Sequence, residues 1–367
     1  MNPLSAGAGT VLIMAGGTGG HIFPALSIAR HLQGKGFRTE WLGTARGLEV
    51  DVLRDTDIPL HLIAARGLRG KGLKDLLLSP FMILNAIWQS LRVIRKVNPC
   101  CVLGMGGYVT GPGGVAAKLS GRPLLIHEQN AIAGFSNMLL ARIATTVMEA
   151  FPATFPAHFR AIATGNPVRT EISEIHRDAD ADHARPLRIL VIGGSLGAVA
   201  LNTVIPEAVA HLAPDLRPQV WHQSGKHNLD ATRSHCASLG LALDADYRVV
   251  PFIEDMAAAY AWADLVVCRA GATTVSELAA AGLPAILVPY PHAVDDHQTH
   301  NAHWLSRAGA ALLIQQRDLS AASLAEIWQG FAKHPRQLVD MGIAAKTLYQ
   351  GDANETVATL CISACKG

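Results

Sequence analysis

The sequence is poor in charged residues and has almost no net charge. Only 16% of its 367 residues are charged and the formal net charge is +2, whereas 50% are hydrophobic. A chain so close to neutrality lacks the basic field of a nucleic-acid-binding protein, so we expect no nucleic-acid partner. The hydrophobic share is ample for large cores, and the length suits two domains better than one.

Long apolar runs and paired cysteines are also missing. No run approaches the roughly 20 apolar residues that a spanning helix needs, and the first ten residues lack the basic region of a signal peptide. None of the six cysteines forms a C-x-x-C pair. We therefore expect a cytosolic protein with reduced cysteines, no signal peptide and no transmembrane helix.

The common nucleotide-binding fingerprints are absent too. The apolar run Val11–Ala15 enters a glycine loop, Gly16–Gly20, which His21 follows. A G-x-G-x-x-G motif would need glycine at Ile22, and no Gly-Lys-Ser/Thr sequence is present, so binding of NAD or ATP is disfavoured. The loop either lets the backbone approach a phosphate or sugar, or is a tight turn alone. Pro24 suits the first turn of the helix expected next.

Polar and glycine-rich segments follow two further strands predicted in the first half. The loop 104–114 contains six glycines in eleven residues, and Leu124–His127 ends in Glu128, Gln129 and Asn130. Ligands of open parallel sheets bind at the carboxyl ends of strands, so both segments are candidate binding elements.

The segment Arg66–Lys96 combines an apolar run with flanking cations. Arg69, Lys71 and Lys74 lie on one side of the run, with Arg92 and Arg95 on the other. This pattern fits a helix on an anionic membrane surface or an ordinary core helix with solvated ends.

The second half repeats the opening pattern. After a polar linker, 171–186, a strand at 187–192 enters another glycine loop, Gly193–Gly197. The segment 264–289 then reads as strand, loop, helix and strand, with an anion site where the helix begins. Alternatively, Thr274–Glu277 forms a capping box and only closes that helix. The tail, 342–366, is predicted to be one helix.

Histidines and aspartates gather at 292–303. His297, His300 and His303 could share a helix face and bind a metal, but a polar loop fits the segment better. We expect no metal and no cofactor.

The ordered motifs resemble the MurG family of bacterial transferases. They are Gly16–His21, Gly104–Tyr108, His127–Asn130, Gly165–Arg169, Gly193–Ser195, His222–Lys226 and Ala257–Glu277. The resemblance implies an α/β fold of the GT-B type, with two Rossmann-like domains facing across a cleft. The N-terminal domain would span 1–168, with a C-terminal helix at about 347–367 crossing back to it, and the donor domain 169–346.

The resemblance also implies a set of binding residues. Glu277 would bind the ribose, Ile253 would lie near the uracil and Gln298 near the sugar, although Asp295–Gln298 departs from the family's usual two adjacent glutamines. The other implied donor contacts are Thr18, Gly19, Gly20, Asn130, Arg169, Ser195, Ala272, Thr273, Thr274, Val275 and Ser276.

The implied reaction is transfer of N-acetylglucosamine from UDP to lipid I with inversion, giving lipid II. His21 is the favoured base, because imidazole exchanges protons near neutral pH, and Glu128 is the runner-up. The implied partners are UDP-N-acetylglucosamine, lipid I, the anionic cytoplasmic face of the inner membrane and other cell-wall synthesis proteins. A UDP-N-acetylglucosamine 2-epimerase and a non-catalytic nucleotide-sugar sensor remain alternatives.

Overall fold

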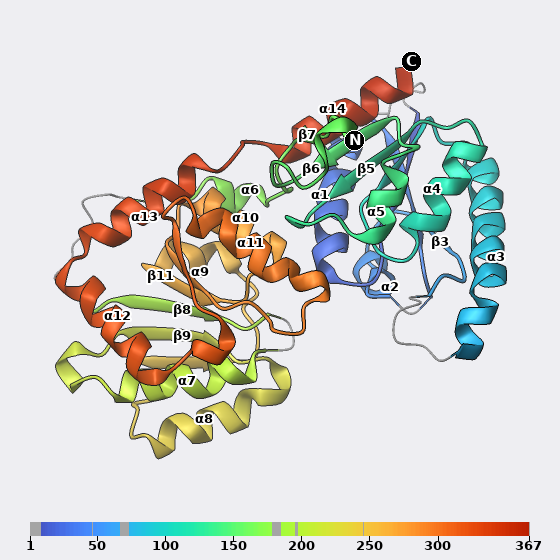
Figure 1. The fold of residues 1–367 in the computed structure, drawn as a ribbon. Helices are drawn as coiled ribbons and strands as arrows, with labels where there is room; N and C mark the ends of the chain where they lie inside the picture. The colour runs from blue at the N-terminus through green and yellow to red at the C-terminus, as the bar shows by residue number, and fades with distance from the viewer. Residues whose placement is uncertain are drawn as a thin grey trace. The chain divides into compact units, whose positions relative to one another are not determined.

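A computed structural model describes residues 9–45, 47–66, 73–177, 185–194, 197–244 and 246–366, with the backbone alone for 73–78. The chain forms two compact units, residues 1–168 with 350–367, and residues 169–349 (Figure 1). Each unit is built on one parallel sheet. Among the described residues, no helix is both long and apolar enough to cross a membrane.

The first unit contains a seven-stranded sheet in the order β3-β2-β1-β4-β5-β6-β7. Its strands are β1 (Thr10–Met14), β2 (Arg38–Gly43), β3 (Leu60–Leu62), β4 (Cys101–Gly104), β5 (Leu124–Glu128), β6 (Thr146–Glu149) and β7 (Ile162–Ala163). Its helices are α1 (Gly19–Gly34), α2 (Glu49–Leu53), α3 (Leu73–Val97), α4 (Thr110–Leu119), α5 (Phe135–Leu140) and α14 (Ala353–Lys366), with a 3-10 turn η1 (Ala157–Phe159). Helices α1 and α14 cover one face of the sheet, and α3, α4 and α5 cover the other.

The second unit contains a six-stranded sheet in the order β10-β9-β8-β11-β12-β13. Its strands are β8 (Arg188–Ile192), β9 (Gln219–Gln223), β10 (Tyr247–Val250), β11 (Leu265–Cys268), β12 (Ala285–Leu287) and β13 (Ala311–Leu313). Its helices are α6 (Thr170–Ser173), α7 (Val199–Ala210), α8 (Leu229–Ser238), α9 (Met256–Trp262), α10 (Ala272–Ala281), α11 (His297–Ser306), α12 (Ala321–Lys333) and α13 (Arg336–Thr347). Four 3-10 turns complete it: η2 (Pro214–Leu216), η3 (Lys226–Asn228), η4 (Val294–Asp296) and η5 (Gln316–Asp318).

The first six strands of each unit therefore follow the same order, with the first strand of each third from one edge of its sheet. Strand β1 pairs with β2 and β4, and β8 pairs with β9 and β11, all in parallel. Successive strands are therefore added first on one side of β1 or β8 and then on the other side, so the order of addition reverses next to that strand. This is the Rossmann arrangement, and its ligand site lies beyond the carboxyl ends of the two strands at the reversal. The expected α/β class with two Rossmann-like domains is confirmed.

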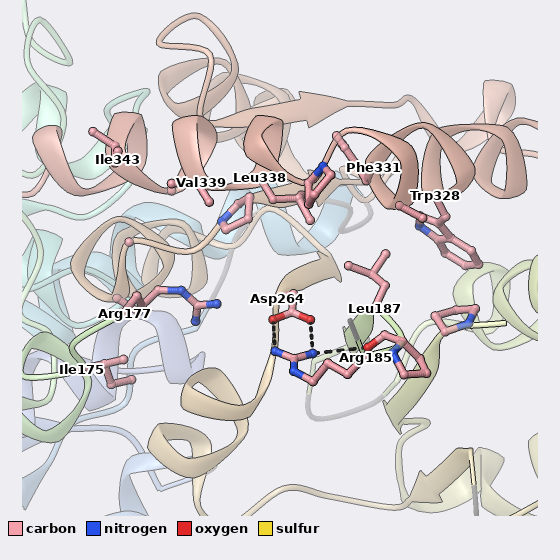
Figure 2. A pocket seen from close by; sticks show the side chains of 18 of the residues that line it. Ile175, Arg177, Arg185, Leu187, Asp264, Trp328, Phe331, Leu338, Val339 and Ile343 are labelled. Atoms are coloured by element: carbon pink, nitrogen blue, oxygen red, sulfur yellow. Dashed lines mark hydrogen bonds and ion pairs between the residues drawn. The ribbon is translucent and has the colours of Figure 1, made fainter. Parts of the chain in front are cut away.

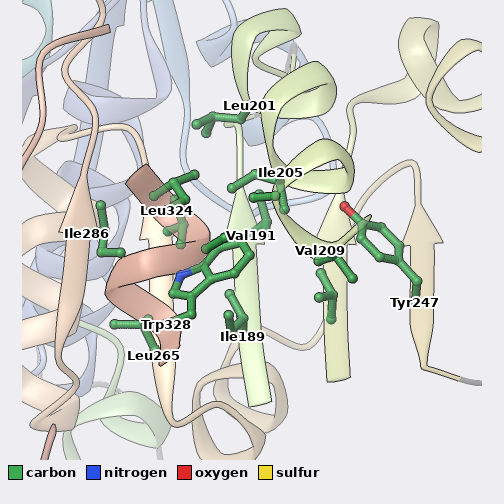
Figure 3. Packing of buried hydrophobic residues seen from close by; sticks show 14 of the residues in the cluster. Ile189, Val191, Leu201, Ile205, Val209, Tyr247, Leu265, Ile286, Leu324 and Trp328 are labelled. Atoms are coloured by element: carbon green, nitrogen blue, oxygen red, sulfur yellow. The ribbon is translucent and has the colours of Figure 1, made fainter. Parts of the chain in front are cut away.

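Buried aliphatic side chains fill the space between sheet and helices. In the second unit Trp328 of α12 packs on Ile189 and Val191 of β8 and faces Ile205 of α7 (Figure 3). These central strands are apolar on both faces, as a sheet covered on both sides requires.

Three local expectations are wrong. Pro24 lies in the sixth position of α1, because the helix already begins at Gly19. The tail is two helices, since Gly351 has a φ of +86° and the Asp352 carboxylate accepts a hydrogen bond from Glu355 N to start α14. Cys100 and Cys365 form a disulfide, because α14 packs beside the start of β4 and so joins residues 265 apart in the sequence.

Candidate active site

The glycine loop after β1 and the loop after β4 touch each other at the reversal point of the first sheet. A Cβ at Gly107, whose φ is +85°, would lie 2.1 Å from Gly16 O, so only glycine permits this approach. The Thr110 hydroxyl donates to Gly106 O at 2.8 Å and accepts from Gly106 N at 3.1 Å. The two loops therefore form one tightly packed element at the carboxyl edge of the sheet.

The start of α1 exposes backbone donors at this edge. Thr18 occupies the N-cap without a side-chain capping bond, and Gly20 and Thr18 are exposed. The first N–H groups of a helix have no intrahelical acceptor, and the helix dipole adds positive character. Glu49, which the sequence analysis missed, is buried and accepts from Gly17 N at 3.2 Å, which holds the loop in place.

The two candidate bases have different surroundings. His21 is half-buried on the first turn of α1, with Nδ1 2.9 Å from Gln129 Oε1. Glu128 is 2% exposed and accepts from Asn130 N at 3.0 Å, Asn130 Nδ2 at 3.2 Å, Gly134 N at 3.0 Å and Asn137 Nδ2 at 2.9 Å. Four donors thus occupy the Glu128 carboxylate. The described hydrogen bond of the His21 ring is made by Nδ1, so the ring's other nitrogen, Nε2, is the atom that could accept a proton.

In the second unit α10, which follows β11, offers a second helix N-terminus at the carboxyl edge of the sheet. The helix begins at Ala272 after the N-cap Gly271, so the alternative of a capping box at Thr274 is wrong: Thr274 is already its third residue. Thr273 and Thr274 are half-buried, whereas the side chains of Val275 and Ser276 are buried. Any ligand here would meet the free N–H groups and the two threonines rather than Val275.

Glu277 contacts side chains instead of closing the helix end. Its Oε1 accepts from Arg169 Nη2 and its Oε2 from the Tyr260 hydroxyl, both at 3.0 Å. Burial raises the pKa of Glu277 above its ordinary value, and the Arg169 guanidinium and the Tyr260 hydroxyl oppose that rise. Tyr260 was not foreseen, because nothing in the sequence of α9 distinguishes it from a core residue.

The remaining predicted donor residues are spread along the loops of the second unit. Ile253 is buried just after β10, and Gln298, on the first turn of α11, accepts from Tyr290 N at 2.9 Å. Ser195 lies outside the described residues. Its neighbour Gly194 has a φ of +84°, and a Cβ at Gly197 would lie 1.9 Å from Ser224 O, so this loop also depends on glycine.

A separate cavity of about 560 Å³ lies at the opposite edge of the second sheet (Figure 2). Leu187, Asp264 and Pro284, which precede β8, β11 and β12, line it, and Arg185 forms a bidentate pair with Asp264 at 2.7 Å. The cavity is therefore at the amino ends of the strands, away from the loops that carry the predicted donor residues.

Among the described residues, one group of potential metal ligands lies close together, Cys100, Cys101 and Cys365. Two of the three are joined in the disulfide, which leaves the Cys101 thiol as the one ligand that this group offers.

Comparison with known proteins identifies the family. Residues 11–149 match the glycosyltransferase family 28 N-terminal domain, and residues 188–357 match its C-terminal domain. The chain is 54% identical over 358 residues to a transferase of Pseudomonas fluorescens SBW25, which covers 97% of this chain and 99% of the relative. That relative is named UDP-N-acetylglucosamine–N-acetylmuramyl-(pentapeptide) pyrophosphoryl-undecaprenol N-acetylglucosamine transferase. A transferase of the same name from Azotobacter vinelandii is 52% identical over 357 residues, covering 97% and 99% of the two chains.

Solved structures support the same family assignment. The crystal structure of Acinetobacter baumannii MurG superposes with a TM-score of 0.83 and 42% identity, covering 96% of this chain and 99% of that one. A Listeria monocytogenes protein described as a putative UDP-N-acetylglucosamine 2-epimerase, with a TM-score of 0.66 and 16% identity over 95% of each chain, shares the fold alone. The chain therefore belongs to glycosyltransferase family 28 and, within it, to the MurG transferases.

Proposed function

We infer that this chain moves N-acetylglucosamine from UDP-N-acetylglucosamine to the muramoyl sugar of undecaprenyl-pyrophosphoryl-MurNAc-pentapeptide, lipid I, which gives lipid II. The observation that carries this conclusion is the 54% identity to a named transferase across nearly the whole of both chains. Glycine loops that leave no room for a side chain follow a strand in both units, as the resemblance implies. The products are lipid II and UDP.

We propose that the second unit holds the donor through the residues named from the resemblance. The free N–H groups of Ala272, Thr273 and Thr274 suit the diphosphate, because a helix N-terminus stabilises negative charge without a metal. Glu277 uses one acceptor position on each oxygen for Arg169 and Tyr260, and a carboxylate offers about four, so ribose hydroxyls can still donate to it. Ser195, Ser276, Ile253 and Gln298 complete this proposed site, and Val275, whose side chain is buried, is left out of it.

We propose His21 as the general base in the first unit. The acceptor's 4-hydroxyl attacks the anomeric carbon while its proton passes to the imidazole, and the bond to the diphosphate breaks on the opposite face. Glu128 is the weaker candidate because its oxygens already receive four hydrogen bonds. Its contacts suit it to shaping the segment that carries Asn130, which we propose, with Thr18, Gly19 and Gly20, as a donor contact.

We propose that α3 binds the anionic cytoplasmic surface of the inner membrane, where the acceptor resides. Phe81, Leu84 and Trp88 expose 73%, 63% and 49% of their surface, and Arg92 stacks on Trp88 with its guanidinium carbon 3.5 Å from the ring centre. Exposed apolar side chains beside cations are typical of an interfacial helix. Arg69 and Lys71 lie outside the described residues, as does the side chain of Lys74.

One assay tests the reaction. UDP release from UDP-N-acetylglucosamine is measured with and without a lipid I analogue. Release that depends on the acceptor supports the transferase. Formation of the 2-epimer without acceptor would support the isomerase instead, and binding of donor without either product would support a sensor.

A further inference from the structure

A chain of three side chains connects the interior of the first unit to His21, and it begins at His127. His127 is fully buried, and its Nε2 lies 3.0 Å from Gly165 O and 3.1 Å from the Thr164 hydroxyl. A carbonyl oxygen can only accept, so Nε2 must carry a hydrogen. Burial lowers the pKa of His127 to about 4, which leaves the ring neutral at physiological pH. His127 Nδ1 is therefore an unprotonated acceptor.

Gln129 is the middle member, and His127 fixes the orientation of its amide. Gln129 Nε2 lies 3.2 Å from His127 Nδ1 and 3.2 Å from His127 O, and both atoms are acceptors. The amide nitrogen must face them, because the opposite orientation would set the amide oxygen against two lone pairs. Gln129 Oε1 therefore faces His21 Nδ1, at 2.9 Å.

The final member is His21 itself. Because Gln129 Oε1 can only accept, His21 Nδ1 must carry the hydrogen, and Nε2 of the neutral ring keeps its lone pair. A Cβ at Gly106, whose φ is +100°, would lie 2.5 Å from Nδ1, so the bare backbone of the loop after β4 packs against this edge of the ring. The ring is thus held by an amide on one side and by a glycine that leaves room for it.

We propose that Gln129, oriented by His127, is a positioning residue that fixes His21 in the Nδ1–H tautomer so that Nε2 can accept the proton of the attacking hydroxyl. The proposal rests on His21 being the base. In the reaction the hydroxyl proton passes to Nε2, the oxygen forms its bond to the anomeric carbon, and the electrons of the broken bond leave with UDP. The imidazolium that results still donates through Nδ1 to Gln129, so the contact persists through the transfer.

Nitrogen-15 NMR of the labelled full chain reads the tautomer directly, because protonated and unprotonated ring nitrogens resonate far apart. In the neutral ring, we expect Nδ1 of His21 to carry hydrogen in the unmodified protein. In Gln129→Met, which removes the acceptor at similar size, the Nδ1–H pattern should weaken. Its kcat should fall by about tenfold or more with little change in donor KM, since a base is lost in part but the donor site is intact.

Two further variants separate positioning from folding. Gln129→Glu keeps an acceptor for His21 Nδ1–H but turns its second oxygen toward the acceptors His127 Nδ1 and O. It should therefore retain the tautomer and more activity than Gln129→Met, at a cost in thermal stability. His222→Gln removes another fully buried, neutral imidazole, which contacts Tyr247 and Asn202 in the second unit. It should lower stability without changing the His21 resonances.

The outcomes are distinct. A His21 that carries hydrogen on Nε2 in the unmodified protein overturns the proposal, and so does unchanged kcat in a folded Gln129→Met. If His21→Ala keeps its turnover, the base assignment fails, yet the NMR result still decides whether Gln129 sets the tautomer.

Discussion

His21 and Glu128 can be separated by mutation, because one has an available ring nitrogen and the other a fully occupied carboxylate. We expect His21→Ala to lower kcat by about 10²- to 10⁴-fold, the usual loss when a general base is removed. We expect Glu128→Gln to act through its four hydrogen bonds and to lower thermal stability more than kcat per folded molecule. Steady-state UDP release and thermal unfolding check the pair. A loss below about tenfold for His21→Ala would exclude it as the base.

Glu277 gives a second test at the residue scale. Burial raises its pKa, so the ionised side chain is costly in the fold and Glu277→Gln should leave the melting temperature nearly unchanged. Binding of the ribose would suffer, and we expect the donor KM to rise by about tenfold or more, the loss typical of a charge-assisted hydrogen bond. Tyr260→Phe is the matched control, since it removes one donor to the same carboxylate and keeps its charge. An unchanged donor KM with a lower melting temperature would assign Glu277 a structural role.

At the scale of elements, α3 is testable by charge reversal. Arg92 and Arg95 are exposed near its end, and each basic residue near an anionic surface contributes about 1 kcal/mol. We expect Arg92→Glu with Arg95→Glu to weaken sedimentation with vesicles containing anionic phospholipid, and salt to weaken binding of the unmodified protein. Arg30→Glu, on α1 across the sheet, is the control and should bind normally. Vesicle binding that is unaffected by salt and by Arg92→Glu with Arg95→Glu would contradict the proposal.

The elements also show how far the sequence predicts the fold. The apolar runs before Gly16, Gly104, Glu128 and Gly193 are strands, as expected. A parallel strand covered on both faces is a short continuous apolar run, and such a run can be recognised in the sequence without knowing which strands it pairs with. Thr274–Glu277 fits a capping box in sequence, but the helix already begins at Ala272 and its N-cap is Gly271, which caps without a side chain. Local patterns give element types well and element ends poorly.

The candidate site was predictable only in part for a related reason. His21, Glu128 and Asn130 stand at ends of elements, where ligand groups are expected. Tyr260 and Arg169 meet Glu277 from positions 17 and 108 residues away, and Cys365 meets Cys100 across 265. Such contacts depend on tertiary packing, which no local spacing encodes.

At the scale of the whole molecule, the described part of each unit contains one fully buried neutral histidine. Burial lowers the pKa of His127 to about 4 and that of His222 to about 3. An unfolded histidine has a pKa of about 6.5, so the unfolded chain binds more protons below that pH. Each histidine's contribution to the free energy of unfolding is fully present above about pH 6.5. It is lost as the pH falls toward 4 for His127 and 3 for His222, on the order of 3–5 kcal/mol for each histidine.

We therefore expect both units to lose stability between about pH 6.5 and 4, measured as the free energy of unfolding in urea. His222→Gln should be less stable at pH 7 but should show a flatter pH dependence, because one titrating group is gone. An unaltered slope in that variant would show that other groups dominate acid unfolding.

The first unit is discontinuous in the sequence, since residues 350–367 complete a structure begun by residues 1–168. A ribosome delivers α14 only after the whole of the contiguous second unit, and domains generally fold as their chains emerge. Until then, the apolar face of α1 that α14 covers has no partner from its own unit. The second unit, which is inserted in the first, can thus complete its fold before the first unit does. Truncation of the last few residues would destabilise the first unit, although most of that unit is synthesised before the second.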